Sequence, residues 1–276
     1  MNLDLIDFER LEKESFSGMT PTPIEDEPSA PAERLALVKQ MIADKKLPAG
    51  LNPYRRPALF YPGLPSAPIY DSRDFPWVQS VLSHVDDLSA ELSALERERS
   101  GRTFHTVWPD FTIAGEWAAM WLRLYGELYR SNATLCPRTL AAIESVPRQG
   151  GWLGFSAMAP RTHVSPHCGV TNAKLRCHLP IELRPGESRI RVHEQVYSWK
   201  KNEIFIFDDS FEHEVWNDSD ARRVILIFDI FHPDLTADEV AFLEKVEGLT
   251  VKQTYNTLME KYHNESSEVA WMYQKT

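Results

Sequence analysis

Short apolar runs separated by turn-forming residues fill the middle of the chain. The runs are rich in β-branched and aromatic residues, which is typical of strands. Many short strands with turns between them favour a barrel or a two-sheet jelly roll over a parallel α/β fold. The expected strands cover residues 152–158, 174–183, 189–193, 203–207 and 222–231, and the expected turns lie at 159–166, 184–188, 198–202 and 217–221.

Apolar residues at helical spacing flank this β-rich middle. Residues 35–42 and 74–99 each carry one apolar stripe, which predicts amphipathic helices. Near the C-terminal end, Thr236 and Glu239 have the spacing of a capping box, in which each side chain bonds the backbone N–H of the other residue. A helix is therefore expected to follow, and a second one is expected over 250–264.

The same pattern divides the chain into three parts. Residues 1–56 form an N-terminal extension, partly flexible because residues 20–33 are rich in proline and acid. Residues 57–237 form a mainly β domain, and residues 238–276 form a helical C-terminal extension. The stretch 115–130 fits a helix or a strand, and we favour a strand at its centre.

Charge and composition exclude several functional classes. The formal net charge of −10 argues against nucleic-acid binding, which normally needs a basic surface. The N-terminus carries no apolar signal core, and no apolar run approaches the about 18 residues of a membrane span. Three cysteines without a CxxC pair fit a reducing compartment. We therefore expect a cytoplasmic protein that acts on a small molecule or a peptide, without a membrane partner; its oligomeric state is left open.

One expected strand has two contrasting faces. Because alternate side chains of a strand share a face, Lys174, Arg176 and His178 lie together, opposite the apolar residues between them. This polar row is either a solvated outer face or an inner face that meets an anion or a metal, since burying such groups without a partner is costly.

Two histidines are candidates for a metal site. His167 and His213 lie 46 positions apart (213 minus 167), and paired imidazoles suit iron, copper, nickel or zinc. The usual non-heme iron site adds a carboxylate, often two residues after the first histidine, but this position is Gly169. Arg223 opens an apolar run and is either a solvated strand end or a bidentate clamp for a carboxylate.

The chain resembles the aspartyl/asparaginyl β-hydroxylase family in two segments. These are PRTHVSPHCGVTNAKLRCHLPIEL and FIFDDSFEHEVWNDSDARRVILIFDIFHPDLT, and the clearest match covers residues 152–235. The pair of strings PHxGxTN and FDDSFEHEVWN is highly specific. The resemblance implies a double-stranded β-helix (jelly roll) with flanking helices, and an Fe(II)/2-oxoglutarate oxygenase.

The resemblance also implies roles for individual residues. It accounts for Gly169, because these hydroxylases bind iron with two histidines and lack the usual carboxylate. His167 and His213 would be the iron ligands. Ser156 and Arg223 would bind the distal carboxylate of 2-oxoglutarate, and Arg176 and His178 would lie beside its metal-binding end. Lys174 would face the substrate region, at a position where the family usually has arginine.

Two roles are possible for Asp209. It is either a turn residue, or a carboxylate that accepts a hydrogen bond from a water on the metal, in place of the missing ligand. Glu212 and Glu214 flank His213 and would point away from it on an extended segment, so neither is expected to be a ligand.

The expected function is therefore that of a dioxygenase using Fe(II), 2-oxoglutarate and O2. It would hydroxylate an unactivated C–H bond of a small acidic metabolite, a biosynthetic intermediate, or an Asp or Asn residue, while lipids rank last because membrane segments are missing. Two alternatives stay open. The same cofactors could support desaturation, cyclisation or epimerisation, or the protein could bind metal and 2-oxoglutarate without catalysis.

Overall fold

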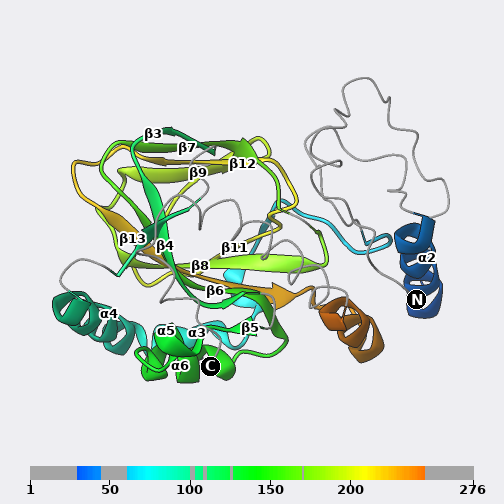
Figure 1. Ribbon diagram of the computed structural model, residues 1–276. Helices are drawn as coiled ribbons and strands as arrows, with labels where there is room; N and C mark the ends of the chain where they lie inside the picture. Colours follow the sequence, from blue (N-terminus) through cyan, green and yellow to red (C-terminus); the bar gives the residue numbers. More distant parts are fainter. Residues whose placement is uncertain are drawn as a thin grey trace, which may run out of the picture.

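Two antiparallel sheets face each other in the computed structural model. It describes residues 30–44, 61–99, 103–107, 111–124, 127–169 and 171–245. The larger sheet has the order β1-β11-β8-β13-β6-β4-β2, with β5 beside β4, and the smaller has the order β10-β9-β12-β7-β3. The expected jelly-roll fold is confirmed, since the sheets stack as the two layers of Figure 1.

The strand bounds are as follows. The larger sheet contains β1 (Ile69–Tyr70), β2 (His105–Thr106), β4 (Trp117–Leu124), β5 (Glu127–Leu128), β6 (Gln149–Met158), β8 (Lys174–Glu182), β11 (Phe205–Phe207) and β13 (Arg223–Phe231). The smaller sheet contains β3 (Thr112–Ala114), β7 (Thr162–His167), β9 (Ser188–Val192), β10 (Gln195–Ser198) and β12 (His213–Asn217).

Each face of the larger sheet has its own apolar core. Leu175, Cys177 and Leu179 of β8 pack outward, with residues of the helices. Ile225 and Ile227 of β13 point inward and pack with residues of the smaller sheet. The polar row of β8 therefore points into the space between the sheets, and a solvated outer face is excluded.

Among the described elements, the helices that cover a sheet lie against the larger sheet (Figure 1). They are α3 (Val78–Leu82), α4 (Val85–Arg99), α5 (Arg130–Ala133) and α6 (Pro137–Glu144), with a 3-10 turn at Ser72–Asp74. The stripe over 74–99 is helical as predicted, but Ser83 and His84 divide it into α3 and α4. The sequence pattern did not predict α5 or α6, which are too short to show a clear period.

Several strands differ from the sequence prediction, among them β7, β10 and β12 of the smaller sheet. The segment 159–166 was predicted as a turn, yet β7 occupies most of it, because Val164 is buried between polar neighbours that hide the alternation. β12 and β10 were also missing from the prediction, as were the short strands β1, β2, β3 and β5. The ambiguous stretch 115–130 forms a strand, as favoured, which begins at Trp117.

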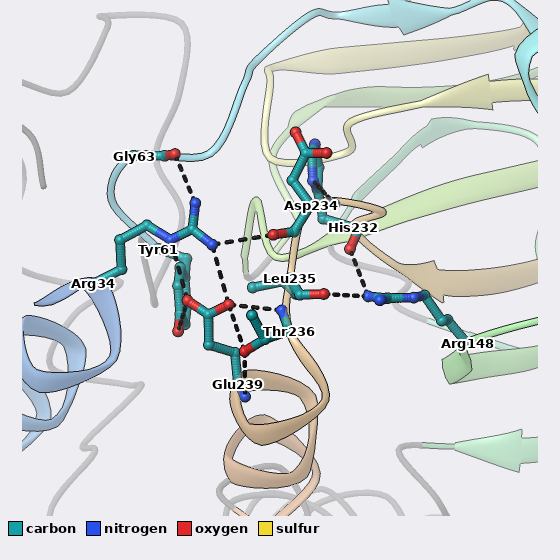
Figure 2. A network of polar contacts seen from close by, with 9 residues as sticks. All are labelled: Arg34, Tyr61, Gly63, Arg148, His232, Asp234, Leu235, Thr236 and Glu239. Carbon is teal, nitrogen blue, oxygen red and sulfur yellow. Dashed lines mark hydrogen bonds and ion pairs between the residues drawn. The ribbon is translucent and has the colours of Figure 1, made fainter. Parts of the chain in front are cut away.

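The two terminal parts of the described chain meet at a buried ion pair, which we call the terminal clasp (Figure 2). Arg34 of α2 (Pro31–Asp44) donates to Glu239 through Nε and Nη2, both at 3.1 Å, and Glu239 lies in the helix of residues 237–245. Tyr61 donates its hydroxyl to the same carboxylate at 2.9 Å. The clasp joins both flanking helices to the chain leading into the β domain.

Two further predictions can be compared with this region. The predicted capping box is confirmed, since the Thr236 N–H donates to Glu239 at 2.7 Å and the Glu239 N–H donates to Thr236 at 3.3 Å. The predicted linker ends earlier than expected, because Pro31–Glu33 form the first turn of α2, where proline costs no hydrogen bond. The helix expected over 250–264 lies outside the described residues.

Candidate active site

The two candidate metal ligands lie opposite each other on neighbouring strands. His213 of β12 pairs with His167 of β7, and their ring centroids are 4.2 Å apart. Within the described ranges, no group of three or more His, Cys, Asp or Glu side chains is placed to hold a metal ion. Two adjacent imidazoles are therefore the candidate metal-binding groups at this position.

Backbone carbonyls set the protonation of both rings. Nδ1 of His167 lies 2.7 Å from the Ser165 carbonyl, and Nδ1 of His213 lies 2.9 Å from the Phe211 carbonyl. A carbonyl can only accept, so each Nδ1 carries the proton and each Nε2 keeps its lone pair. Burial lowers the pKa of both histidines, which keeps the imidazoles neutral and able to bind a metal.

Arg223 is a buried cation at the first position of β13. It is 3% exposed, and its Nε atom has no hydrogen-bond partner in the part of the chain that the structure describes. Burial lowers its pKa to about 9, so the guanidinium stays charged near neutral pH. Its charge lies 4.8 Å above the Trp199 ring. A buried guanidinium of this kind is suited to receive an anion.

Ser156 and His178 add polar groups to the same inner face. Ser156 pairs with Ile225, two residues after Arg223, and its Oγ accepts from Trp117 at 2.9 Å, which leaves its own O–H to donate. Both ring nitrogens of His178 are buried without a hydrogen-bond partner among the described residues. Burial and the nearby Arg223 lower its pKa, so this ring is neutral as well.

Phe207 connects these groups to the histidine pair. Its ring centroid lies 5.0 Å from that of His178 and 5.4 Å from that of His213. The buried polar groups and the two imidazoles therefore belong to one site between the sheets.

Four charged side chains form the remaining wall. Arg176 donates to Asp229 through Nε at 3.0 Å and Nη2 at 3.2 Å, and its Nη1 lies 2.8 Å from Asp209. Lys174 is 4% exposed, and a Cβ at Gly151 would touch both its ammonium and the Asp229 carboxylate. Two cations and two carboxylates thus offset each other in a buried cluster.

Asp209 fills the space beside Gly169. A Cβ placed on Gly169 would collide with the Asp209 carboxyl group, and the Gly169 N–H donates to the Asp209 carbonyl at 2.6 Å. Burial raises the pKa of Asp209 to about 7, against the lowering effect of Arg176. The space that a side chain at residue 169 would need is therefore filled by the Asp209 carboxyl group, and the role of Asp209 toward a metal-bound water stays a prediction.

Sequence reasoning missed Asp229. A single acid within the apolar run VILIFDIF, six residues after Arg223 and therefore on its face of the strand, was an available signal. Its ion pair joins β13 to β8 and depends on a pairing register that the sequence does not reveal.

The donor set fits a divalent metal with a keto-dicarboxylic acid. Two neutral imidazoles, each with a lone pair on Nε2, suit Fe(II). The Nε of Arg223, without a hydrogen-bond partner among the described residues, and the Ser156 hydroxyl suit a carboxylate at the far end of the site. These observations fit the predicted ligand sets, whose individual roles stay predictions.

Comparison with known proteins gives a family. The family model described as aspartyl/asparaginyl β-hydroxylase matches residues 83–233, more than half of the chain. The human protein named aspartyl/asparaginyl β-hydroxylase is 36% identical over 129 residues, covering 45% of this chain and 17% of its own length. A Rhizobium tropici protein named ornithine lipid ester-linked acyl 2-hydroxylase is 34% identical, covering 63% of this chain and 64% of its own length.

Similarity to solved structures is weaker. A prolyl-4-hydroxylase from Pseudomonas putida aligns with 56% of this chain and 98% of its own, at a TM-score of 0.35 and 11% identity. Among the described helices, none is long and apolar enough to cross a membrane. By the extent of the family match, the chain belongs to the aspartyl/asparaginyl β-hydroxylase family.

Proposed function

We propose that the protein is an Fe(II)- and 2-oxoglutarate-dependent dioxygenase that hydroxylates an unactivated C–H bond. The observation that carries the proposal is the pair of adjacent imidazoles, His167 and His213, whose Nδ1 atoms both face carbonyls. The buried guanidinium of Arg223, near His178 at the far end of the site, supports a dicarboxylic co-substrate. The named hydroxylases among the relatives support the reaction class.

The side chains would divide the work of binding. His167 and His213 would hold the metal, and Arg223 with Ser156 would bind the distal carboxylate of 2-oxoglutarate. When bound, Fe(II) and 2-oxoglutarate supply the oxidising chemistry, consuming O2 and releasing CO2 and succinate. Asp209, whose carboxyl group lies beside Gly169, would accept a hydrogen bond from a water on the metal.

Anaerobic spectroscopy tests this proposal. Adding Fe(II) and 2-oxoglutarate to the protein without O2 should give a weak visible charge-transfer band. The band should disappear in His167→Ala and in His213→Ala, because each substitution removes one of the two ligands. His163→Ala is the matched control, since His163 is on β7 but hydrogen-bonds Glu214 instead. A missing band in the wild type, or a band that survives both ligand substitutions, would refute the proposal.

The substrate has two candidate classes. The first is a small acidic molecule or an Asp or Asn residue, with Lys174 near its anionic group. The second is an acyl chain, supported by the Rhizobium tropici relative and by apolar surface near His167: Phe111 is 36% exposed with its ring 5.5 Å from His167, and Ile113 is 62% exposed. The lipid class therefore ranks higher than the sequence alone suggested.

Product mass decides between the outcomes. Succinate release should be measured with acidic metabolites, Asp-containing peptides and acylated amino acids, followed by mass spectrometry. A gain of one oxygen supports hydroxylation, and a loss of two hydrogens indicates desaturation or cyclisation. Succinate from none of these pools would favour a binding protein without catalysis.

A further inference from the structure

Asp229 is a buried carboxylate to which neither the sequence motifs nor the proposed ligand sets give a role. It is 3% exposed and lies on the inner face of β13, where the strand pairing places it opposite Arg176 of β8. Burying two charges costs several kcal/mol in desolvation, and such a pair seldom adds net stability. An ion pair beside a candidate metal site therefore calls for a role in orientation.

The contacts of Asp229 fix the plane of the Arg176 guanidinium. One carboxylate oxygen accepts from Nε of Arg176 at 3.0 Å, and the other accepts from Nη2 at 3.2 Å. The second oxygen also accepts from the Trp152 N–H at 2.9 Å, which anchors the carboxylate to β6. The guanidinium lies 4.1 Å from the centre of the Trp152 ring. Two hydrogen bonds and one aromatic face leave the group little freedom to rotate.

The remaining nitrogen of the Arg176 guanidinium, Nη1, contacts a second carboxyl group instead of Asp229. Nη1 lies 2.8 Å from Asp209, whose carboxyl group fills the space beside Gly169. A chain of contacts thus runs from Asp229 through Arg176 to Asp209, whose carboxyl group lies beside Gly169, two residues after His167. Loss of the first contact would free the guanidinium to move toward Asp209 alone.

We propose that Asp229 is a positioning residue that acts through Arg176. It holds the guanidinium where it can reach Asp209 and the metal-binding end of 2-oxoglutarate at the same time. The inference rests on the proposed function and on the role that the family resemblance implies for Arg176, at the metal-binding end of the co-substrate. It adds a residue that touches neither metal nor co-substrate but sets how tightly the site binds both.

Calorimetry on the Mn(II)-loaded protein tests the inference without relying on turnover. Oxalate is the probe, because it offers only the metal-binding end of a keto acid. Asp229→Asn should raise the dissociation constant of oxalate by about tenfold or more, as is usual when a partner of a site residue is lost. The control is Glu239→Gln, which removes another buried, arginine-paired carboxylate at the terminal clasp and should leave oxalate binding within about twofold.

A second background separates positioning from general damage. If Asp229 acts through Arg176, adding Asp229→Asn to an Arg176→Met variant should change oxalate binding no further. A further loss in that background would overturn the inference, because it would show an effect that bypasses Arg176. Unchanged binding in a folded Asp229→Asn variant would overturn it too.

Trp152→Leu keeps the test decisive if Asp229→Asn does not fold. This variant removes the aromatic face under Arg176 and should weaken oxalate binding several-fold. Trp216→Leu is its control, since the Trp216 ring lies 5.0 Å from the Arg189 guanidinium, outside the site. Equal binding in these two variants would overturn the inference. A wild-type protein that binds no Mn(II) would overturn the proposed function and this inference together.

Discussion

At the scale of single residues, Gly169 and Asp209 compete for one space. Gly169→Ala should place a Cβ against the Asp209 carboxyl group and lower the free energy of unfolding by about 1–3 kcal/mol, as overpacking does. In an Asp209→Gly background, where the space is open, the same substitution should cost much less. Equilibrium urea unfolding of the four proteins measures the difference. An equal cost in both backgrounds would show that Asp209 does not limit residue 169.

The polar row of β8 could be predicted from the sequence, but its pairing with Asp229 could not. Strand alternation alone placed Lys174, Arg176 and His178 on one face, and the structure shows that this face is internal. Alternation could not show that Arg176 would be shared by two carboxylates, because Asp229 is 53 residues away and meets it only through the pairing of β8 with β13.

At the scale of elements, the terminal clasp ties α2 to the C-terminal helix. Arg34→Met should leave Glu239 buried without its cation and lower the free energy of unfolding by about 3–5 kcal/mol. Arg138→Met is the control, since Arg138 and Asp87 also join two helices but are 62% and 55% exposed in their side chains, and its cost should be about 0–1 kcal/mol. Chemical unfolding measures both, and a small loss for Arg34→Met would show that the clasp adds no stability.

Elements were predictable where their pattern was long. The helical stripe over 74–99 and the apolar run of β13 were recognised from their period. β7, which carries His167, was predicted as a turn because only its buried valine and threonine alternate with polar residues and it ends near a proline. Its place in the sheet comes from pairing with β12 and β3, which single-strand patterns do not contain.

At the scale of the whole molecule, the burial of neutral imidazoles links folding to pH. Burial keeps the pKa of His178 well below 6.5 in the folded protein, whereas in the unfolded chain the ring takes up a proton below about pH 6.5. The unfolded state then binds more protons than the folded state, so the free energy of unfolding falls as the pH drops.

The comparison of wild type with His178→Gln isolates this effect. The free energy of unfolding of the metal-free wild type, relative to the variant, should fall as the pH goes from 7.5 to 5.5, with a limiting slope of about 1.4 kcal/mol per pH unit. Between pH 7.5 and 8.5 the difference should be flat, because the ring is neutral in both states. A difference that is flat over the whole range would contradict the burial of a neutral ring.

The fold as a whole was predictable because many short strands have few other ways to pack. The division at residues 56 and 237 stays a prediction, although the clasp shows that Arg34 and Glu239, from the two extensions, share one buried contact. The short helices α5 and α6 were not predictable, since four and eight residues give too little period to recognise.

The inward row of β8 has a consequence for how this gene can change. Lys174, Arg176 and His178 alternate with Leu175, Cys177 and Leu179, and pairings with β11 and β13 fix their register. One codon inserted or deleted within the strand would exchange the two sets, sending charges into the helix-covered core and leucines into the site. A substitution in β8 therefore changes one side chain at a time, whereas a change in the length of β8 would move many of its side chains to the opposite face at once.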